Sequence, residues 1–136
     1  MNMLEFDALP DGPKPAHAER LMEAARRYRD MEQAAYRSMS GADVAEAPLR
    51  GLTADGLACI AEGKDPEATI LFLEVKWRVY ATENNRKVEA APRIKRGPSA
   101  GHSVISHRWV SPDAFQTVSV FLRSMLTPPP QPDGTP

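Results

Sequence analysis

Eight basic side chains lie within 33 residues in the second half of this 136-residue chain. The basic residues are Lys76, Arg78, Arg86, Lys87, Arg93, Lys95, Arg96 and Arg108. Three aromatic residues lie between or directly after them: Trp77, Tyr80 and Trp109. Lysine and arginine neutralise phosphate groups, and aromatic rings stack on bases. This combination indicates contact with nucleic acid or with an acidic protein surface.

The distribution of charge sets this basic segment apart from the rest of the chain. Residues 1–75 hold fourteen acidic and eight basic side chains, whereas residues 76–108 hold eight basic side chains and two glutamates. The formal net charge of −1 conceals this division. Either the basic segment binds a polyanion, or its charges form an ordinary solvated surface that pairs with the acidic first half.

Metal and cofactor chemistry is not expected. His102 and His107 are an odd number of residues apart, so in a regular strand they project from opposite faces. His17 lies far away in the sequence, and no cysteine or pair of acids stands at zinc-ligand spacing from any histidine. The sequence therefore predicts neither a cofactor nor a metal site.

Catalysis is not expected either. The chain contains no G-x-S-x-G elbow, P-loop or G-x-G-x-x-G motif. "R-G-P-S-A-G", 96–101, has glycines that suit a phosphate loop, but Pro98 removes a backbone donor and a mobile loop explains it equally well. Cys59 stands among apolar neighbours, which favours a small buried thiol over a nucleophile. The prediction is a protein that is not an enzyme, with no catalytic residues.

The expected compartment is the cytoplasm, with no membrane partner. The longest apolar run, Ala68 to Leu73, is far shorter than the roughly 20 residues of a membrane span. Acidic residues occupy the N-terminus where a secretory signal carries basic ones. The single cysteine forms no internal disulfide, which agrees with a reducing compartment.

Proline content predicts the domain boundaries. Residues 1–14 are expected to be a flexible segment, 15–127 a single α+β domain, and 128–136 a proline-rich disordered tail. The tail has P-x-x-P spacing at Pro129 and Pro132, which a polyproline-binding domain recognises but which also occurs in plain spacers.

The first predicted element is a long helix over 15–39. Its apolar stripe contains Leu21, Ala24, Tyr28, Met31 and Ala35 at helical spacing. The stripe is narrow and rich in alanine, so the helix packs either on its own core or on a second copy in a homodimer. A loop over 41–52 and a short helix from Ala54 to Glu62, with Thr53 as N-cap, are expected next.

The stretch from Leu71 to Thr82 has two possible conformations. As a helix opened by Asp65 and Pro66, it carries two opposite apolar faces, and both require burial. As a strand, it alternates apolar and polar residues and needs only one buried face. Valine and aromatic content also suits a strand, so the sequence analysis favours a strand.

The remaining elements complete an antiparallel sheet. "E-N-N-R-K", 83–87, predicts a turn, 88–94 a second strand and 102–110 a third, followed by a helix that begins near Ser111. The predicted fold class is therefore α+β: long N-terminal helix, short helix, three-stranded antiparallel sheet, C-terminal helix. The exposed sheet face would carry Lys76, Arg78 and Tyr80, with Arg93, Lys95 and Arg96 at a hairpin tip.

One segment resembles a known family. "E-G-K-D-P-E-A-T-I-L-F-L", Glu62 to Leu73, is similar to a segment of phage small-terminase-like DNA-packaging proteins, in which D-P-x-A opens a helix near the end of the domain. The resemblance implies a helix here and a DNA partner. It covers twelve of the 136 residues and identifies no family.

The predicted function is a small non-enzymatic binding protein, phage-related or regulatory, that contacts nucleic acid through its basic hairpin region. The alternative is a protein-interaction module or inhibitor that docks through its sheet face or first helix. The predicted nucleic-acid-binding residues are Lys76, Arg78, Tyr80, Arg86, Lys87, Arg93, Lys95, Arg96 and Arg108.

Overall fold

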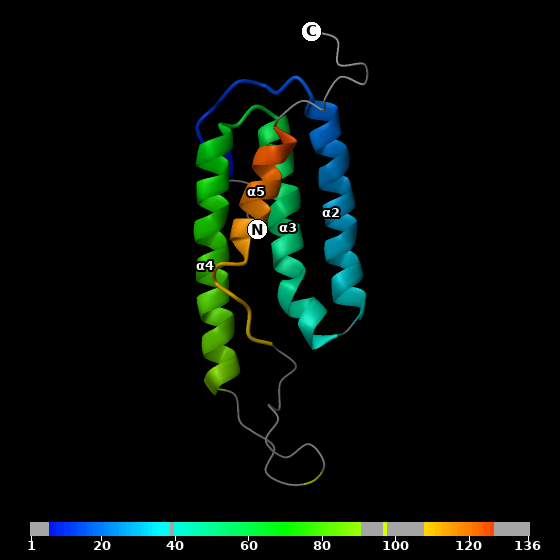
Figure 1. Ribbon diagram of the computed structural model, residues 1–136, viewed down its shortest axis with the longest axis vertical. Coiled ribbons are helices and arrows are strands. Elements are labelled where there is room, and N and C mark those ends of the chain that lie inside the picture. The colour runs from blue at the N-terminus through cyan, green and yellow to red at the C-terminus, as the bar shows by residue number, and fades with distance from the viewer. Residues whose placement is uncertain (1–5, 39, 91–96, 98–107, 127–136) are drawn as a thin grey trace.

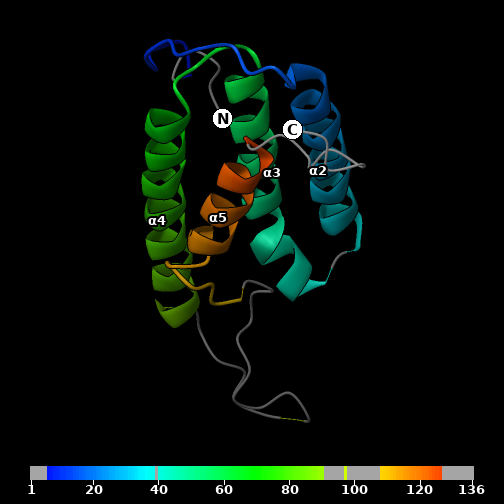
Figure 2. The same cartoon turned by 45° about the horizontal axis from the view of Figure 1, so that its top comes forward.

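Four labelled helices run alternately in opposite directions in the computed structural model, which describes residues 6–38, 40–90, 97 and 108–126 (Figure 1). They are α2 (Ala18–Ser38), α3 (Gly41–Ala61), α4 (Pro66–Ala90) and α5 (Phe115–Met125). Helices α2 and α4 lie at opposite edges, with α3 and α5 between them, both in Figure 1 and in Figure 2. Helix α4 packs on α3 and α5, so one side of it faces solvent.

The predicted α+β fold is wrong. The described residues form helices and no strand, and a single isolated bridge joins Asp11 to Lys64. The three expected strands are not formed there, because 71–82 and 88–90 lie in α4 and 108–110 have no regular secondary structure; 91–94 and 102–107 lie outside the described residues.

Helix α2 confirms the long helix predicted over 15–39. Glu19 lies in its first turn and Arg37 in its last, where each charge complements the helix dipole. Leu21 and Ala24 from the predicted apolar stripe are buried in the chain's own core. Further along the stripe Met31 is exposed, so only the first half of the stripe is used for packing.

Helix α3 replaces the predicted loop over 41–52 and the short helix that was expected to follow it. Ser40 caps it by accepting a hydrogen bond from the backbone N–H of Asp43, and the helix continues through Pro48. Thr53 is not an N-cap: its hydroxyl donates to the carbonyl of Leu49, one turn back in the same helix. The proline costs one helical hydrogen bond, and the helix nevertheless packs extensively against α2.

Helix α4 replaces the predicted strand. Asp65 caps it by accepting from the backbone N–H of Ala68 at 2.9 Å, and Pro66 takes the first helical position, as the helical alternative required. A stripe of buried residues then recurs at helical spacing: Thr69, Ile70, Leu73, Trp77, Ala81, Asn84 and Asn85. The strand was favoured because a helix was expected to bury both of its apolar faces. The structure shows that the helix buries only one of them.

Gly56 allows α3, α4 and α5 to pack closely. A Cβ atom at this position would lie 2.7 Å from a methyl group of Leu73 in α4 and 3.2 Å from one of Leu122 in α5. A side chain here would force these two methyl groups to move, because such contacts are well below van der Waals distance. The centre of the core therefore depends on a residue without a side chain.

Two adjacent asparagines of α4 hold the segment that leads into α5. The Asn85 amide donates to the carbonyl of Val110 at 2.7 Å and accepts from its N–H at 2.8 Å, as a neighbouring strand would. Asn84 donates to the carbonyl of Arg108 at 2.7 Å. The indole N–H of Trp77 donates to the carbonyl of Ser111 at 2.8 Å. The turn predicted at "E-N-N-R-K" is wrong, since these asparagines are helical.

Residues 6–12, which the sequence assigned to a flexible segment, pack on the helices. Phe6 is buried and its ring meets that of Phe72 edge-on, with centroids 5.6 Å apart. Gly12 donates its N–H to the carbonyl of Gly63 at 2.7 Å in the turn between α3 and α4. Lys64 donates to the carbonyl of Leu9 at 3.2 Å. This segment closes the end of the bundle where α4 begins.

We expect Asn85→Ala to lower the free energy of unfolding by about 2–3 kcal/mol, because it leaves the buried N–H and carbonyl of Val110 without partners. Urea denaturation followed by tryptophan fluorescence measures the change. The exposed Gln33→Ala in α2 is the control, with a change within about 0.5 kcal/mol. Equal effects of the two substitutions would show that the asparagine does not hold the segment.

Candidate functional site

Helix α4 carries a second row of apolar side chains, opposite the core. Leu71, Val75 and Val79 follow one another at one-turn intervals and are 62%, 54% and 62% exposed. On the other side of the same helix, Trp77 is completely buried. We call these three residues the outer face of α4. Single exposed aliphatic residues are common, but three in one row mark a surface suited to docking.

A shallow groove continues the outer face toward the end of α4. Its volume is about 420 Å³, and it is lined by Val75, Arg78, Val79, Thr82, Glu83 and Arg86. Valine methyl groups and the aliphatic stems of the arginines make such a lining mostly apolar. The shape and chemistry suit another helix lying along α4.

Another exposed valine lies at the rim of the outer face. Arg123 of α5 binds Glu67 of α4 at 2.9 Å, and the two helices are antiparallel. Val120 precedes Arg123 by three residues and is 68% exposed. Antiparallel helices advance equally in opposite directions, so Val120 lies at about the level of residue 70. Because Val120 shares one side of α5 with Arg123, and Leu71 shares one side of α4 with Glu67, this level places Val120 on the side of Leu71.

Ion pairs within the chain neutralise the charges around the outer face. Glu74 lies 3.0 Å from Arg78, and Glu83 lies 2.5 Å from Arg86. The hydrogen bond from Arg123 lowers the pKa of the exposed Glu67. Solvent screening makes such pairs weak contributors to stability. Their effect is to surround an apolar row with little net charge.

The predicted basic residues do not share one surface of α4. Arg78 and Arg86 border the groove beside the outer face, whereas Lys76 and Tyr80 line a cleft toward α2 and α3. Lys87 is exposed in the last turn of α4. Arg108 is also exposed, and its backbone carbonyl accepts a hydrogen bond from the side chain of Asn84. The predicted hairpin-tip residues, Arg93, Lys95 and Arg96, lie outside the described residues.

The cleft between α2, α3 and α4 has a volume of about 300 Å³. The Tyr80 hydroxyl is used inside the fold, since it donates to the carbonyl of Ala45 at 3.0 Å. Burial raises the pKa of Tyr80 and, together with the charge of Glu32, that of Tyr36. Lys76 lies 5.5 Å from the centre of the Phe72 ring, a distance typical of a cation–π contact.

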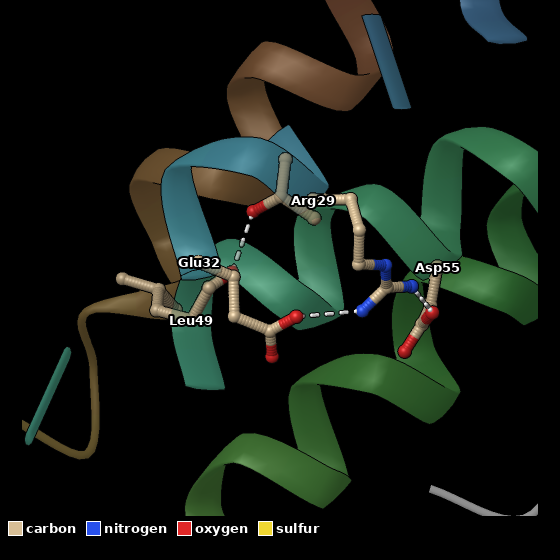
Figure 3. Close-up of polar contacts among 5 residues, drawn as sticks. Arg29, Glu32, Leu49 and Asp55 are labelled. Atoms are coloured by element: carbon tan, nitrogen blue, oxygen red, sulfur yellow. Dashed lines mark hydrogen bonds and ion pairs between the residues drawn. The ribbon is translucent and has the colours of Figure 1, made fainter. Parts of the chain in front are cut away.

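Arg29 binds two carboxylates at the wall of this cleft (Figure 3). Its guanidinium donates to Glu32 of its own helix at 2.8 Å and to Asp55 of α3. Burial opposes the charge, but these hydrogen bonds outweigh it and raise the pKa of Arg29. A Cβ atom at Gly51 would overlap the Glu32 carboxylate. This cluster joins α2 to α3, and its one positive and two negative charges leave a formal net charge of −1.

In the part of the chain that the structure describes, no group of three or more metal-binding side chains converges. His17 lies before α2, and His102 and His107 fall outside the described ranges. Cys59 is buried, and burial with the nearby charges of Asp55 and Glu62 raises the pKa of its thiol to about 12.

Comparison with protein families, curated proteins and solved structures finds no match to this chain. None of the helices in the described ranges is both long and apolar enough to cross a membrane.

Sequence analysis missed the outer face because it assigned Leu71, Val75 and Val79 to the buried side of a strand. The signal was nevertheless present. The helical alternative had two opposite apolar faces, and a small four-helix bundle can bury only one of them when the helix lies at its edge. A helix with two apolar faces is therefore a sequence signature of an interaction surface.

The buried thiol predicts slow alkylation. At pH 8, iodoacetamide should modify Cys59 in the folded chain at least about a hundredfold more slowly than in concentrated guanidinium, because only the thiolate reacts and its fraction falls tenfold per pKa unit. Mass spectrometry of the time course measures both rates. The rate in the folded chain should rise with pH up to the pKa near 12. Equal rates in the folded and unfolded chain would contradict the burial of this thiol.

Proposed function

We propose that this protein is a protein-interaction module that binds a helix of a polypeptide partner on the outer face of α4. The supporting observation is the row of Leu71, Val75 and Val79, which are each more than half exposed on a helix whose opposite side is buried in the core. These residues contribute little to the core of this chain, so their apolar character is best explained by a partner. Helix-in-groove recognition uses such rows of residues one turn apart.

The flanking ion pairs favour a partner with little net charge over a polyanion. Arg78 and Arg86 are already bound by Glu74 and Glu83, so a phosphate group would have to compete with a carboxylate for each arginine. Nucleic-acid binding through the basic segment stays a prediction. It depends most on Arg93, Lys95 and Arg96, which lie outside the described residues.

Burial of the outer face provides enough free energy for a partner to bind with moderate affinity. Fully burying a valine or leucine side chain contributes about 1.5–3 kcal/mol, and these three start from half to two-thirds exposed. Part of that gain offsets the entropy lost on association. We therefore expect affinities in the micromolar range, as in a transient or regulated contact.

The proposal is tested with a designed helical peptide that has leucines on one face and alternating glutamate and lysine elsewhere, labelled with a fluorophore. Fluorescence anisotropy should report micromolar binding to the folded chain. Replacing Val75 and Val79 by glutamate should weaken binding about tenfold or more, because two charges would enter an apolar contact. Circular dichroism should show that the double variant is still folded, since both side chains are exposed.

The matched control carries the same added charge away from the outer face. Gln33→Glu combined with Ala34→Glu changes two exposed positions of α2 and should leave peptide binding intact. Absence of binding to the unmodified chain, or equal loss in both double variants, would exclude the outer face as a docking surface.

A further inference from the structure

One edge of the outer face carries an acid and a base one helical turn apart. Glu74 and Arg78 point along the same side of α4, with their charged groups 3.0 Å apart, and Arg78 also lies 3.9 Å from Asp113. Consider a two-fold axis across the helix at the level of residue 76. It would bring Glu74 of one copy beside Arg78 of the other, and the reverse, so this edge is complementary to itself when two helices run antiparallel.

The apolar residues match in the same register. Positions at equal distances on opposite sides of residue 76 lie level with each other, so Leu71 is level with residue 81 of the second copy. Its side chain then enters the space between Val79 and Thr82 of that copy, while Val75 lies beside Val79. This is the arrangement of a knob between residues of a facing helix. One register therefore satisfies both the charged edge and the apolar row.

We infer that the helix bound by the outer face is α4 of a second copy of this chain, so that two copies form an antiparallel, two-fold pair. This inference rests on the proposed function and names its partner. The neutral surroundings of the outer face allow two identical copies to approach without net repulsion, because each arginine there has its own glutamate. The homodimer was predicted to form through the first helix. We place the contact on α4 instead, because the first half of the α2 stripe is buried within the chain.

The size of α4 suits a pair of moderate affinity. Its 25 residues extend for about 38 Å at roughly 1.5 Å per residue, and its position at the edge of the bundle leaves its outer side open. Standard interfaces bury about 800 Å² on each partner. A helix of this length with the rim residue Val120 can approach that area, but the apolar centre contains only three aliphatic side chains. The pair should therefore dissociate in the micromolar range.

Reciprocal charge reversal tests both the pairing and its direction. Glu74→Arg places arginine opposite Arg78 of the second copy, and Arg78→Glu places glutamate opposite Glu74. Each variant alone should self-associate at least about tenfold more weakly than the unmodified chain. An equimolar mixture of the two should recover association, because each contact again joins an acid to a base. Sedimentation equilibrium measures the masses, and circular dichroism confirms that both variants are folded.

The outcomes separate the pairing from the proposed function. An unmodified chain that stays monomeric at several hundred micromolar would overturn the pairing; if the designed peptide still binds the outer face, the docking function survives with a different helical partner. If neither occurs, both proposals fail. Self-association of the unmodified chain without recovery in the mixture would overturn the antiparallel register. A rise in mass only after addition of duplex DNA would overturn the pairing in favour of the basic segment.

Discussion

The burial of Trp77 is the constraint on which the rest of this structure depends. Its ring is completely buried, and its indole N–H donates to the carbonyl of Ser111, so it joins α4 to the segment that leads into α5. Once Trp77 points inward, helical geometry turns Leu73 inward with it and turns Val75 and Val79 toward solvent. The outer face is therefore a consequence of how the core is built, and not an independent feature of the surface.

Much of the helical content could be predicted, because its signals are local. The first helix follows from its periodic stripe, and the start of α4 follows from Asp65 and Pro66, whose capping hydrogen bond the structure confirms. The second half of α3 was predicted as a short helix, but its first half was predicted as a loop, and the structure shows that the helix runs through Pro48 and packs against α2. The asparagines at 84 and 85 resembled a turn, since their partners lie about 25 residues away.

The interaction surface could not be recognised from the sequence while every apolar residue was expected to be buried. That assumption favoured a strand for Leu71 to Thr82, and it concealed the most informative property of the segment. The hypothesis that the basic segment forms one nucleic-acid-binding surface is weakened by the helical geometry, which separates Lys76 and Tyr80 from Arg78 and Arg86. Glutamates also bind the two arginines. The spacing of charges along a sequence is a weak guide to a surface until the secondary structure is known.

Methyl NMR of the unmodified chain, recorded as it is diluted from millimolar to low micromolar concentration, tests the central claim most directly. The account predicts that the methyl signals of Leu71, Val75 and Val79 shift together with dilution, while those of the buried Leu73 and Leu122 stay constant. Shifts that instead cluster on α2, or signals of the outer face that do not respond to concentration, would contradict an α4-mediated contact between copies.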